Sequence, residues 1–178
     1  MISVIFPCYN EIENITKNKI KIINFIKKNK DLEIIFVDNG SSDKLSDCIK
    51  SEFKEFNNIK LVKINHNKGY GDGVYQGIRK ATYDNVAWMH ADFQVSLEDL
   101  RKGCDIYLKN NKKLNNKLFV KARRKNRNFS DIFFTFFMSL ISSILFFKKI
   151  NDINATPNII NKNAFKSIEN IPIDFSFD

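Results

Sequence analysis

Short apolar runs alternate along the chain with longer stretches in which apolar residues recur every three or four positions. The runs are rich in β-branched residues and predict strands, whereas the longer stretches predict amphipathic helices. Ser96 and Asp99 form a capping-box pattern at the start of one such stretch. The Asn- and Lys-rich stretch 110–116 predicts a flexible loop. Strands are expected at 2–6, 32–37, 59–64, 86–89 and 118–120, and helices at 13–28, 44–56, 73–81 and 97–108.

Polar residues follow three of the predicted strands directly. Alternating strands and helices favour an α/β fold with a mostly parallel sheet, helices on both faces and a ligand crevice at the carboxyl ends of the strands. We therefore expect the three polar groups to face one crevice. The carboxylate, imidazole and amide of the third group can bind one divalent cation, and such an ion can hold a diphosphate. The groups are Pro7-Cys8-Tyr9-Asn10-Glu11, Asp38-Asn39-Gly40-Ser41-Ser42-Asp43 and His90-Ala91-Asp92-Phe93-Gln94.

Length and cysteine content narrow the class of protein. The chain has 178 residues, 43% of them hydrophobic, which suits one globular domain over 1–178 and is short for two. Its three cysteines, Cys8, Cys48 and Cys104, are an odd number and lack metal-type spacing. An apolar strand begins at Ile2 with no signal-peptide pattern before it. These features predict a reducing, cytosolic location.

The net charge of +9 is concentrated in one region. Eleven Lys and Arg residues and one acid lie between Arg101 and Arg127. Most of these lysines suit a solvated surface as well as a functional one. Arg123, Arg124 and Arg127 stand out in a chain whose basic residues are mostly Lys, because a guanidinium binds phosphate through two parallel hydrogen bonds. An anionic lipid headgroup or a phosphorylated substrate is the expected partner, since the patch lacks the interleaved aromatic residues typical of nucleic-acid binding.

An apolar, Phe-rich segment covers residues 129–147 and is flanked by basic residues. Its uninterrupted part, from Ile132 to Phe147, is shorter than the ~20 residues that a helix needs to span a bilayer. Two interpretations stay open, a membrane-interfacial helix and a helix buried in the core.

Four motifs taken together resemble those of family 2 glycosyltransferases, with the closest similarity to the polyprenyl- and dolichyl-phosphate sugar transferases. The resemblance is strongest from residue 2 to about residue 94 and weaker from 152 to 165. It implies the GT-A fold, a Rossmann-like nucleotide-binding domain. Members usually continue beyond a segment like the one at 171–178, which predicts that the chain is truncated at its carboxyl end. The motifs are Pro7-x-Tyr9-Asn10-Glu11, Val37-Asp38-Asn39-Gly40-Ser41-Ser42-Asp43, Asn67-Lys68-Gly69-Tyr70-Gly71 with Gly77, and His90-Ala91-Asp92-x-Gln94.

The resemblance assigns a nucleotide-binding role to the residues of the first three motifs. Asp38 and Asn39 would meet the base and ribose, with capping of the next helix as the alternative role for this motif. The family commonly has two acids where this chain has Asp38-Asn39, which leaves the choice of base open. The full nucleotide-binding set predicted is Pro7, Tyr9, Glu11, Asp38, Asn39 and Gly69.

The predicted metal site departs from the family pattern, because His90 replaces the first acid. Imidazole is a poor ligand of Mg²⁺ and an acceptable ligand of Mn²⁺. Asp92 is therefore expected to be the principal ligand of Mn²⁺ or Mg²⁺, with Gln94 as an auxiliary ligand. His90 is either a third ligand or a hydrogen-bond donor to the ligands.

The resemblance implies an inverting, metal-dependent hexosyltransferase that uses a UDP- or GDP-sugar. The expected acceptor is a polyprenyl phosphate at the cytoplasmic face of the cell membrane, in cell-envelope glycan synthesis. Arg123 and Arg127 would hold its phosphate, and with a hydroxyl acceptor Asp152 is the candidate base beside the catalytic Asp92. The alternative is a transferase-like domain that has lost turnover and binds lipid or nucleotide.

Overall fold

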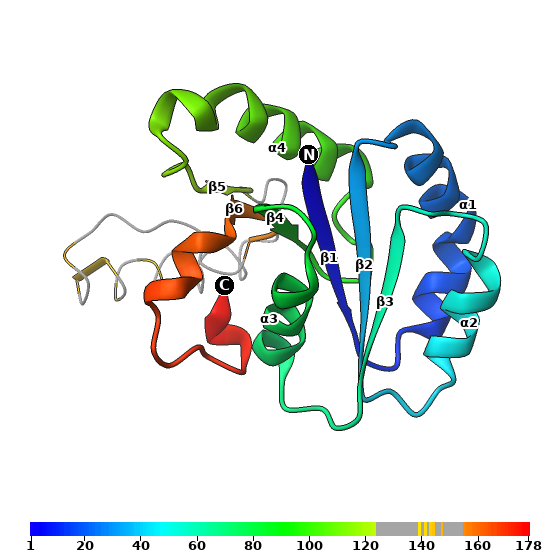
Figure 1. The fold of residues 1–178 in the computed structure, drawn as a ribbon. Coiled ribbons are helices and arrows are strands. Elements are labelled where there is room, and N and C mark those ends of the chain that lie inside the picture. Colours follow the sequence, from blue (N-terminus) through cyan, green and yellow to red (C-terminus); the bar gives the residue numbers. More distant parts are fainter. Residues whose placement is uncertain (124–138, 140, 142, 145–146, 148–154) are drawn as a thin grey trace, which may run out of the picture.

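The protein is described here by a computed structural model, which covers residues 1–123, 139, 141, 143, 144, 147 and 155–178 (Figure 1). Six strands form one sheet in the order β3-β2-β1-β4-β6-β5. The strands are β1 (Ile2–Cys8), β2 (Leu32–Asn39), β3 (Ile59–Ile64), β4 (Asn85–Trp88), β5 (Val120–Lys121) and β6 (Asn158–Asn161).

The four strands β1 to β4 run parallel, whereas β6 lies antiparallel to both β4 and β5. Every residue of β1 and β2 is buried. Strands that carry apolar residues on both faces must be covered on both faces, which is the usual condition of a parallel sheet. The mostly parallel α/β sheet expected of a GT-A fold is confirmed.

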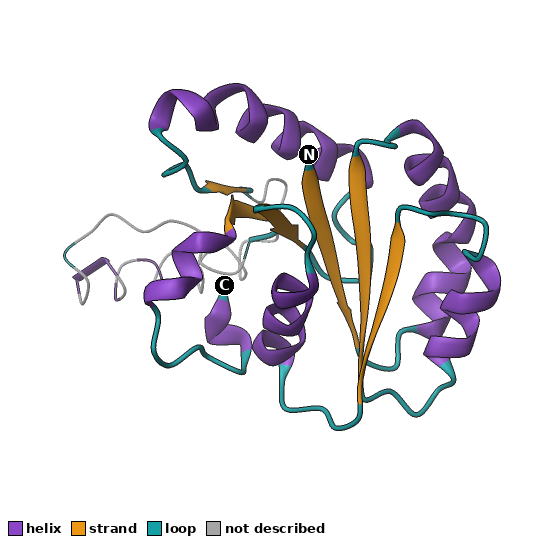
Figure 2. Ribbon diagram, in the orientation of Figure 1, coloured by secondary structure: helices purple, strands orange, loops and turns teal. Residues whose placement is uncertain are grey.

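Helices cover the sheet on both faces (Figure 2). On one face α1, α2 and α4 pack against Val4, Phe6 and Phe36, and on the other α3 packs against Ile5 and Val37. The structure also has short 3₁₀ helices. Helix η1 (Lys112–Leu114) follows α4, η2 (Lys162–Ser167) follows β6, and η3 (Phe175–Phe177) lies near the carboxyl end of the described residues. The longer helices are α1 (Ile12–Lys28), α2 (Leu45–Glu52), α3 (Tyr70–Lys80) and α4 (Leu97–Asn111).

The structure differs from the sequence prediction in several elements, among them β5, which covers only Val120–Lys121, and β6, which was not predicted. The helix expected to reach residue 56 ends at Glu52, where Phe53 leaves the helical conformation and stacks on Phe36 in the core. Helix α3 begins at Tyr70, three residues earlier than predicted. The prediction of a loop at 110–116 is wrong for its first half, because α4 runs to Asn111 and η1 follows. The buried Asn111 side chain donates a hydrogen bond to Asn116 Oδ1 at 2.9 Å.

A polar cluster around the buried Glu33 lies at the amino-terminal ends of the parallel strands. The Glu33 carboxylate accepts hydrogen bonds from Ser3 Oγ at 2.5 Å, Thr82 Oγ1 at 2.6 Å and Thr82 N at 2.9 Å, and Lys60 Nζ lies 2.6 Å from it. Burial acts to raise the pKa of Glu33, but the hydrogen bonds from Lys60, Ser3 and Thr82 outweigh it and lower the pKa to about 2. Both carboxylate oxygens are therefore satisfied within the protein.

Several sequence predictions fall outside the described residues. Arg124, Arg127 and Asp152 are among them, as is most of the apolar segment 129–147. Within the part of the chain that the structure describes, no helix is both long enough and apolar enough to cross a bilayer.

Candidate functional site

A cavity of about 360 Å³ opens at the carboxyl ends of the parallel strands. It is enclosed by the loops that follow β1 and β4, the end of β2, the start of α3 and Phe175 of the carboxyl-terminal segment. Seven residues predicted to form the nucleotide and metal sites meet here, although they come from four separate parts of the chain. They are Pro7, Tyr9, Glu11, Asn39, Gly69, His90 and Asp92, and the other lining residues are Cys8, Asn67, Tyr70, Ala91 and Phe175.

The loop after β1 is held by the loop after β2. Asn10, with φ +56°, donates its backbone N–H to Ser41 Oγ at 3.0 Å, and its Oδ1 accepts from Ser42 N at 2.9 Å. Asp43 Oδ2 accepts from the backbone N–H of Ile12 at 2.9 Å, which satisfies a donor in the first turn of α1. These contacts fix the backbone that carries Tyr9 and Glu11 at the wall of the cavity.

Asn39 presents an unused hydrogen-bond acceptor. Its Nδ2 donates to the Gly69 carbonyl at 2.9 Å and to Asn67 Oδ1 at 3.3 Å, so the orientation of the amide is set by two acceptors. An aspartate could donate to neither. Asn39 Oδ1 is buried and has no partner in the described residues, and a buried acceptor of this kind needs a donor from a ligand or water.

Asp38, the neighbouring residue, is already occupied by the protein. Its Oδ1 accepts from Ser41 N at 2.9 Å and its Oδ2 from the Ser46 hydroxyl of α2. The side chain is buried and does not line the cavity. Both oxygens of Asp38 thus have partners within the protein, and its contact with a nucleotide stays a prediction.

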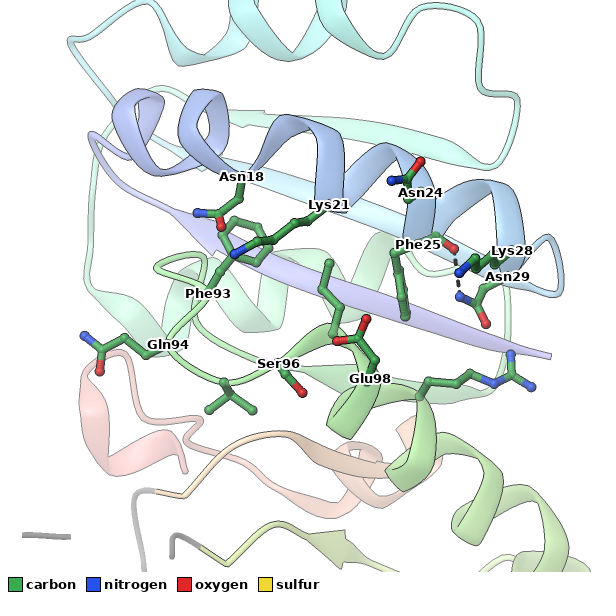
Figure 3. Close-up of a pocket in the computed structure, with 13 residues that line it drawn as sticks. Asn18, Lys21, Asn24, Phe25, Lys28, Asn29, Phe93, Gln94, Ser96 and Glu98 are labelled. Atoms are coloured by element: carbon green, nitrogen blue, oxygen red, sulfur yellow. Dashed lines mark hydrogen bonds between the residues drawn. The ribbon is translucent and has the colours of Figure 1, made fainter. Parts of the chain in front are cut away.

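The turn after β4 points Asp92 toward the cavity and Gln94 away from it. Asp92 Oδ1 accepts from the Gln94 backbone N–H at 3.1 Å, while Phe93 adopts φ +53° and packs its ring 5.6 Å from that of Phe6. The exposed Gln94 lines a second groove, of about 620 Å³, between α1 and the start of α4 (Figure 3). A direct contact of Gln94 with an ion at Asp92 stays a prediction.

His90 lies beside a carboxylate that sequence reasoning missed. Asp178 Oδ2 is 4.0 Å from His90 Nε2, and only 2% of the Asp178 side chain is exposed. The Tyr70 ring packs against the His90 ring with the centroids 4.8 Å apart, and Phe175 stacks on Tyr70 at 5.0 Å. The signal for Asp178 was weak: an aspartate close to two phenylalanines near the end of the chain.

The cavity is acidic, although the chain as a whole is basic. Glu11 and Asp92 line it, and none of its described lining residues is Lys or Arg. Burial raises the pKa of Tyr70, and the negative charges of Asp178 and Asp92 raise it further. Burial raises the pKa of the Cys8 thiol well above its ordinary value, with added effects of Glu11 and other acids. A diphosphate would be repelled here unless a cation accompanied it.

The donor atoms present suit a divalent cation shared with a ligand. No group of three His, Cys, Asp or Glu side chains within the described ranges converges on one point. His90 and Asp92 therefore supply at most two protein ligands. Mg²⁺ and Mn²⁺ sites for phosphate compounds commonly have one or two carboxylates, with phosphate oxygens and waters completing the shell. The residues present fit such an ion.

The predicted acceptor site is described only at Arg123. This residue is exposed, lies two positions after β5 and is not among the lining residues of the cavity.

Proteins of known activity are similar to this chain in sequence and in fold. Poly-β-1,6-N-acetyl-D-glucosamine synthase of Staphylococcus aureus (strain COL) is 36% identical over 93 residues, which are 51% of this chain and 21% of the relative. The chain thus spans about a fifth of the length of the curated relatives it matches. A mannosyltransferase of Pyrobaculum calidifontis, solved with GDP-Man and Mn²⁺, superposes with TM-score 0.68 at 18% identity, covering 97% of this chain and 47% of that one.

Glucosyl-3-phosphoglycerate synthase of Mycobacterium tuberculosis, solved with Mn²⁺, UDP and glucosyl-3-phosphoglycerate, gives TM-score 0.71 at 16% identity over 97% of this chain and 60% of its own. At such identities the likeness shows a shared fold. The sequence model of "Glycosyl transferase family 2" matches residues 3–149, which is more than half of the chain and includes all four motifs. The chain therefore belongs to glycosyl transferase family 2.

Proposed function

We propose that the protein binds a nucleoside diphosphate sugar together with Mn²⁺ or Mg²⁺ and transfers the sugar to an acceptor. The observation that carries this proposal is the acidic cavity, in which Asn39 Oδ1 lacks a donor and Asp92 faces no cationic side chain among the described lining residues. An uncharged amide oxygen suits a base or a ribose hydroxyl, and a carboxylate suits a cation. One ligand that has both features is a nucleotide diphosphate with its metal ion.

Each lining group has a separate task in this proposal. Tyr9, which is half exposed, offers a ring face to the base, and Asn39 accepts a hydrogen bond from the base or the ribose. Asp92 and His90 hold the cation. When bound, the cation neutralises charge that develops on the leaving diphosphate. Solved neighbours of the same fold hold GDP-Man in one case and UDP in another, so both UDP and GDP belong in the first assay.

The proposed acceptor is a polyprenyl phosphate, and the proposed location is the cytoplasmic face of the membrane. A phosphate acceptor is already an anion and needs no general base to attack the anomeric carbon, with inversion of configuration. Arg123, exposed after β5, and Arg127 would hold that phosphate, while the segment 129–147 would contact the prenyl chain. With a hydroxyl acceptor, Asp152 remains the candidate base.

The donor half of the proposal is tested by thermal unfolding with UDP or GDP, each with and without Mn²⁺. A ligand that binds the native state raises the melting temperature, and we expect a rise only when nucleotide and ion are both present. Asp92→Ala should lose the ion-dependent part. Glu55→Ala, an exposed acid away from the cavity, is the matched control and should keep it. Equal stabilisation of Asp92→Ala and the wild type contradicts the assignment.

The acceptor half needs a separate assay. Replacing Arg123 and Arg127 by Ala should reduce transfer to a polyprenyl phosphate more than it reduces nucleotide binding. Wild-type protein that binds nucleotide and ion but transfers no sugar to lipid phosphates or hydroxyl acceptors would instead support the alternative of a binding domain without turnover.

A further inference from the structure

Asp178 is held in place by donors from three elements. Its Oδ1 accepts from Trp88 Nε1 of β4 at 2.7 Å, Asn158 Nδ2 of β6 at 3.2 Å and the Tyr70 hydroxyl of α3 at 3.3 Å. In addition Lys121 Nζ donates to the Asp178 carbonyl at 2.9 Å. A carboxylate that is nearly fully buried and fixed from three sides cannot turn freely, so the direction of its second oxygen is set by the fold.

That second oxygen faces the imidazole of His90. Oδ2 lies 4.0 Å from His90 Nε2, whereas all three donors above approach Oδ1. Tyr70 links the two groups, because its hydroxyl donates to Asp178 while its ring packs on His90 with an interplanar angle of 30°. Phe175 stacks on Tyr70 at an angle of 13°, and its ring centroid lies 6.4 Å from that of His90. The His90 ring is therefore packed on one face by Tyr70, and its Nε2 lies within electrostatic reach of Asp178 Oδ2 but too far for a direct hydrogen bond.

We propose that Asp178 is a positioning residue that keeps a proton on His90 Nε2 and so leaves the Nδ1 lone pair for the divalent ion bound by Asp92. This inference rests on the proposed function for its metal and deepens it by assigning the role of His90. A neutral imidazole has one N–H and one lone pair, and a nearby carboxylate places the N–H on the nitrogen that faces it. At many metal sites a carboxylate that accepts the N–H of a histidine ligand orients its ring, and a small movement of His90 would bring Asp178 into that contact.

The pairing explains why an imidazole can serve at a position where the resembling family has an acid. The carboxylate of an aspartate needs no partner to fix its proton, whereas a histidine presents a lone pair to an ion only in one tautomer. Asp178 supplies the constraint that selects this tautomer. The competing explanation is that Asp178 only ties β4, β6 and α3 together and has no influence on His90.

The tautomer is measured directly by ¹H–¹⁵N correlation of the imidazole rings without metal at pH 8, where an ordinary histidine is neutral. The chain has two histidines, His66 and His90, and the exposed His66 serves as an internal reference. We expect His90 to show the Nε2–H form and Asp178→Asn to lose this preference, because the introduced amide can donate to Nε2. A wild-type His90 in the Nδ1–H form overturns the proposal, even where Asp178→Asn fails to fold.

A double-mutant cycle then tests the link to the ion. Mn²⁺ affinity is read from the electron paramagnetic resonance signal of the free ion in the presence of UDP or GDP. Asp178→Asn should weaken binding on the order of 10-fold or more in the wild type. In a His90→Asp background, where no tautomer exists, the same change should alter affinity less than about 2-fold.

Equal losses in both backgrounds show that Asp178 acts only through the fold and contradict the proposal. If the wild type binds no Mn²⁺ with either nucleotide, the proposed function fails, whereas the tautomer of His90 is still decided by the metal-free spectrum. The two failures are therefore distinguishable.

Discussion

Glu33 and Asn39 are buried polar residues at opposite ends of the parallel strands, and they differ in whether the protein supplies partners for their side-chain oxygens. At the amino-terminal edge Glu33 has its oxygens matched by Ser3, Thr82 and Lys60. At the carboxyl edge Asn39 Oδ1 has no partner within the described residues. A satisfied buried network stabilises a fold, while a polar atom left open at the same depth costs stability unless a ligand completes it. Of the two residues, only Asn39 therefore has a buried oxygen that a ligand in the cavity could satisfy.

The charges follow the same division. Lys60 lies 2.6 Å from Glu33 and compensates its charge, whereas Asp92 at the other edge faces a cavity whose described lining has no Lys or Arg. Lys60 supplies the compensating positive charge at Glu33, whereas the proposed bound cation would supply it at Asp92. Changes at the carboxyl edge should therefore affect ligand binding, and changes at the amino-terminal edge should affect stability.

The largest effect is expected at Asp92. Asp92→Asn should reduce kcat/KM with a nucleotide sugar by at least about 100-fold, because it removes the proposed carboxylate ligand of the cation. The free energy of unfolding without ligand should change by less than about 0.5 kcal/mol, since the side chain lies on the cavity surface. Steady-state kinetics and urea unfolding measure the two quantities. A large loss of stability would place Asp92 with Glu33 as a structural carboxylate.

The next effect concerns the segment that carries Asp178. Gly71→Ala should destabilise the protein by about 1–3 kcal/mol, because the new Cβ would lie 2.3 Å from the Pro172 carbonyl oxygen. Gly103→Ala, also within a helix, is the control, since its Cβ would meet the flexible end of Ile159 and lie at an ordinary contact distance of 3.8 Å from Pro157. Urea unfolding of both variants makes the measurement. Comparable stabilities would show that the segment does not depend on Gly71.

Glu33→Gln tests the opposite edge. Loss of the charge weakens hydrogen bonds from Ser3, Thr82 and Lys60, so the free energy of unfolding should fall by about 1–2 kcal/mol. The affinity of the folded protein for nucleotide and Mn²⁺ should not change, because the cluster lies at the far edge of the sheet. Isothermal titration at a temperature well below the melting transition checks the second part. A weakened affinity would mean that the two edges are coupled.

The smallest effect is the pH dependence of stability due to Glu33. Its folded pKa, about 2, lies below the ordinary value of an unfolded glutamate, so its contribution is complete above about pH 5 and declines as pH falls toward 2. Between pH 5 and pH 4 the loss should stay below about 1 kcal/mol, and screening at the half-exposed Lys60 reduces it further. Glu33→Gln should flatten this part of the curve in urea unfolding at each pH. Parallel curves for the two proteins would contradict the prediction.

The sequence alone determined the fold class and most of the cavity. The alternation of apolar runs and helical patterns predicted the order of strands and helices up to α4, because each element repeats its period over several residues. Placing polar groups at the carboxyl ends of parallel strands predicted that Tyr9, Asn39 and Asp92 would meet. This inference needs only topology, since such ends share one edge of the sheet.

Only the tertiary structure decided which of the neighbouring polar residues serve the cavity. Successive residues of a strand point to opposite faces, and packing of α2 on one face and α3 on the other sends Asp38 to Ser46 and Asn39 to Gly69. The meeting of His90 with Asp178 likewise depends on how the final segment crosses the start of α3, with Asp72 N donating to the Ile173 carbonyl at 3.2 Å. Contacts between residues far apart in the chain follow from packing, which no local pattern of polar and apolar residues encodes.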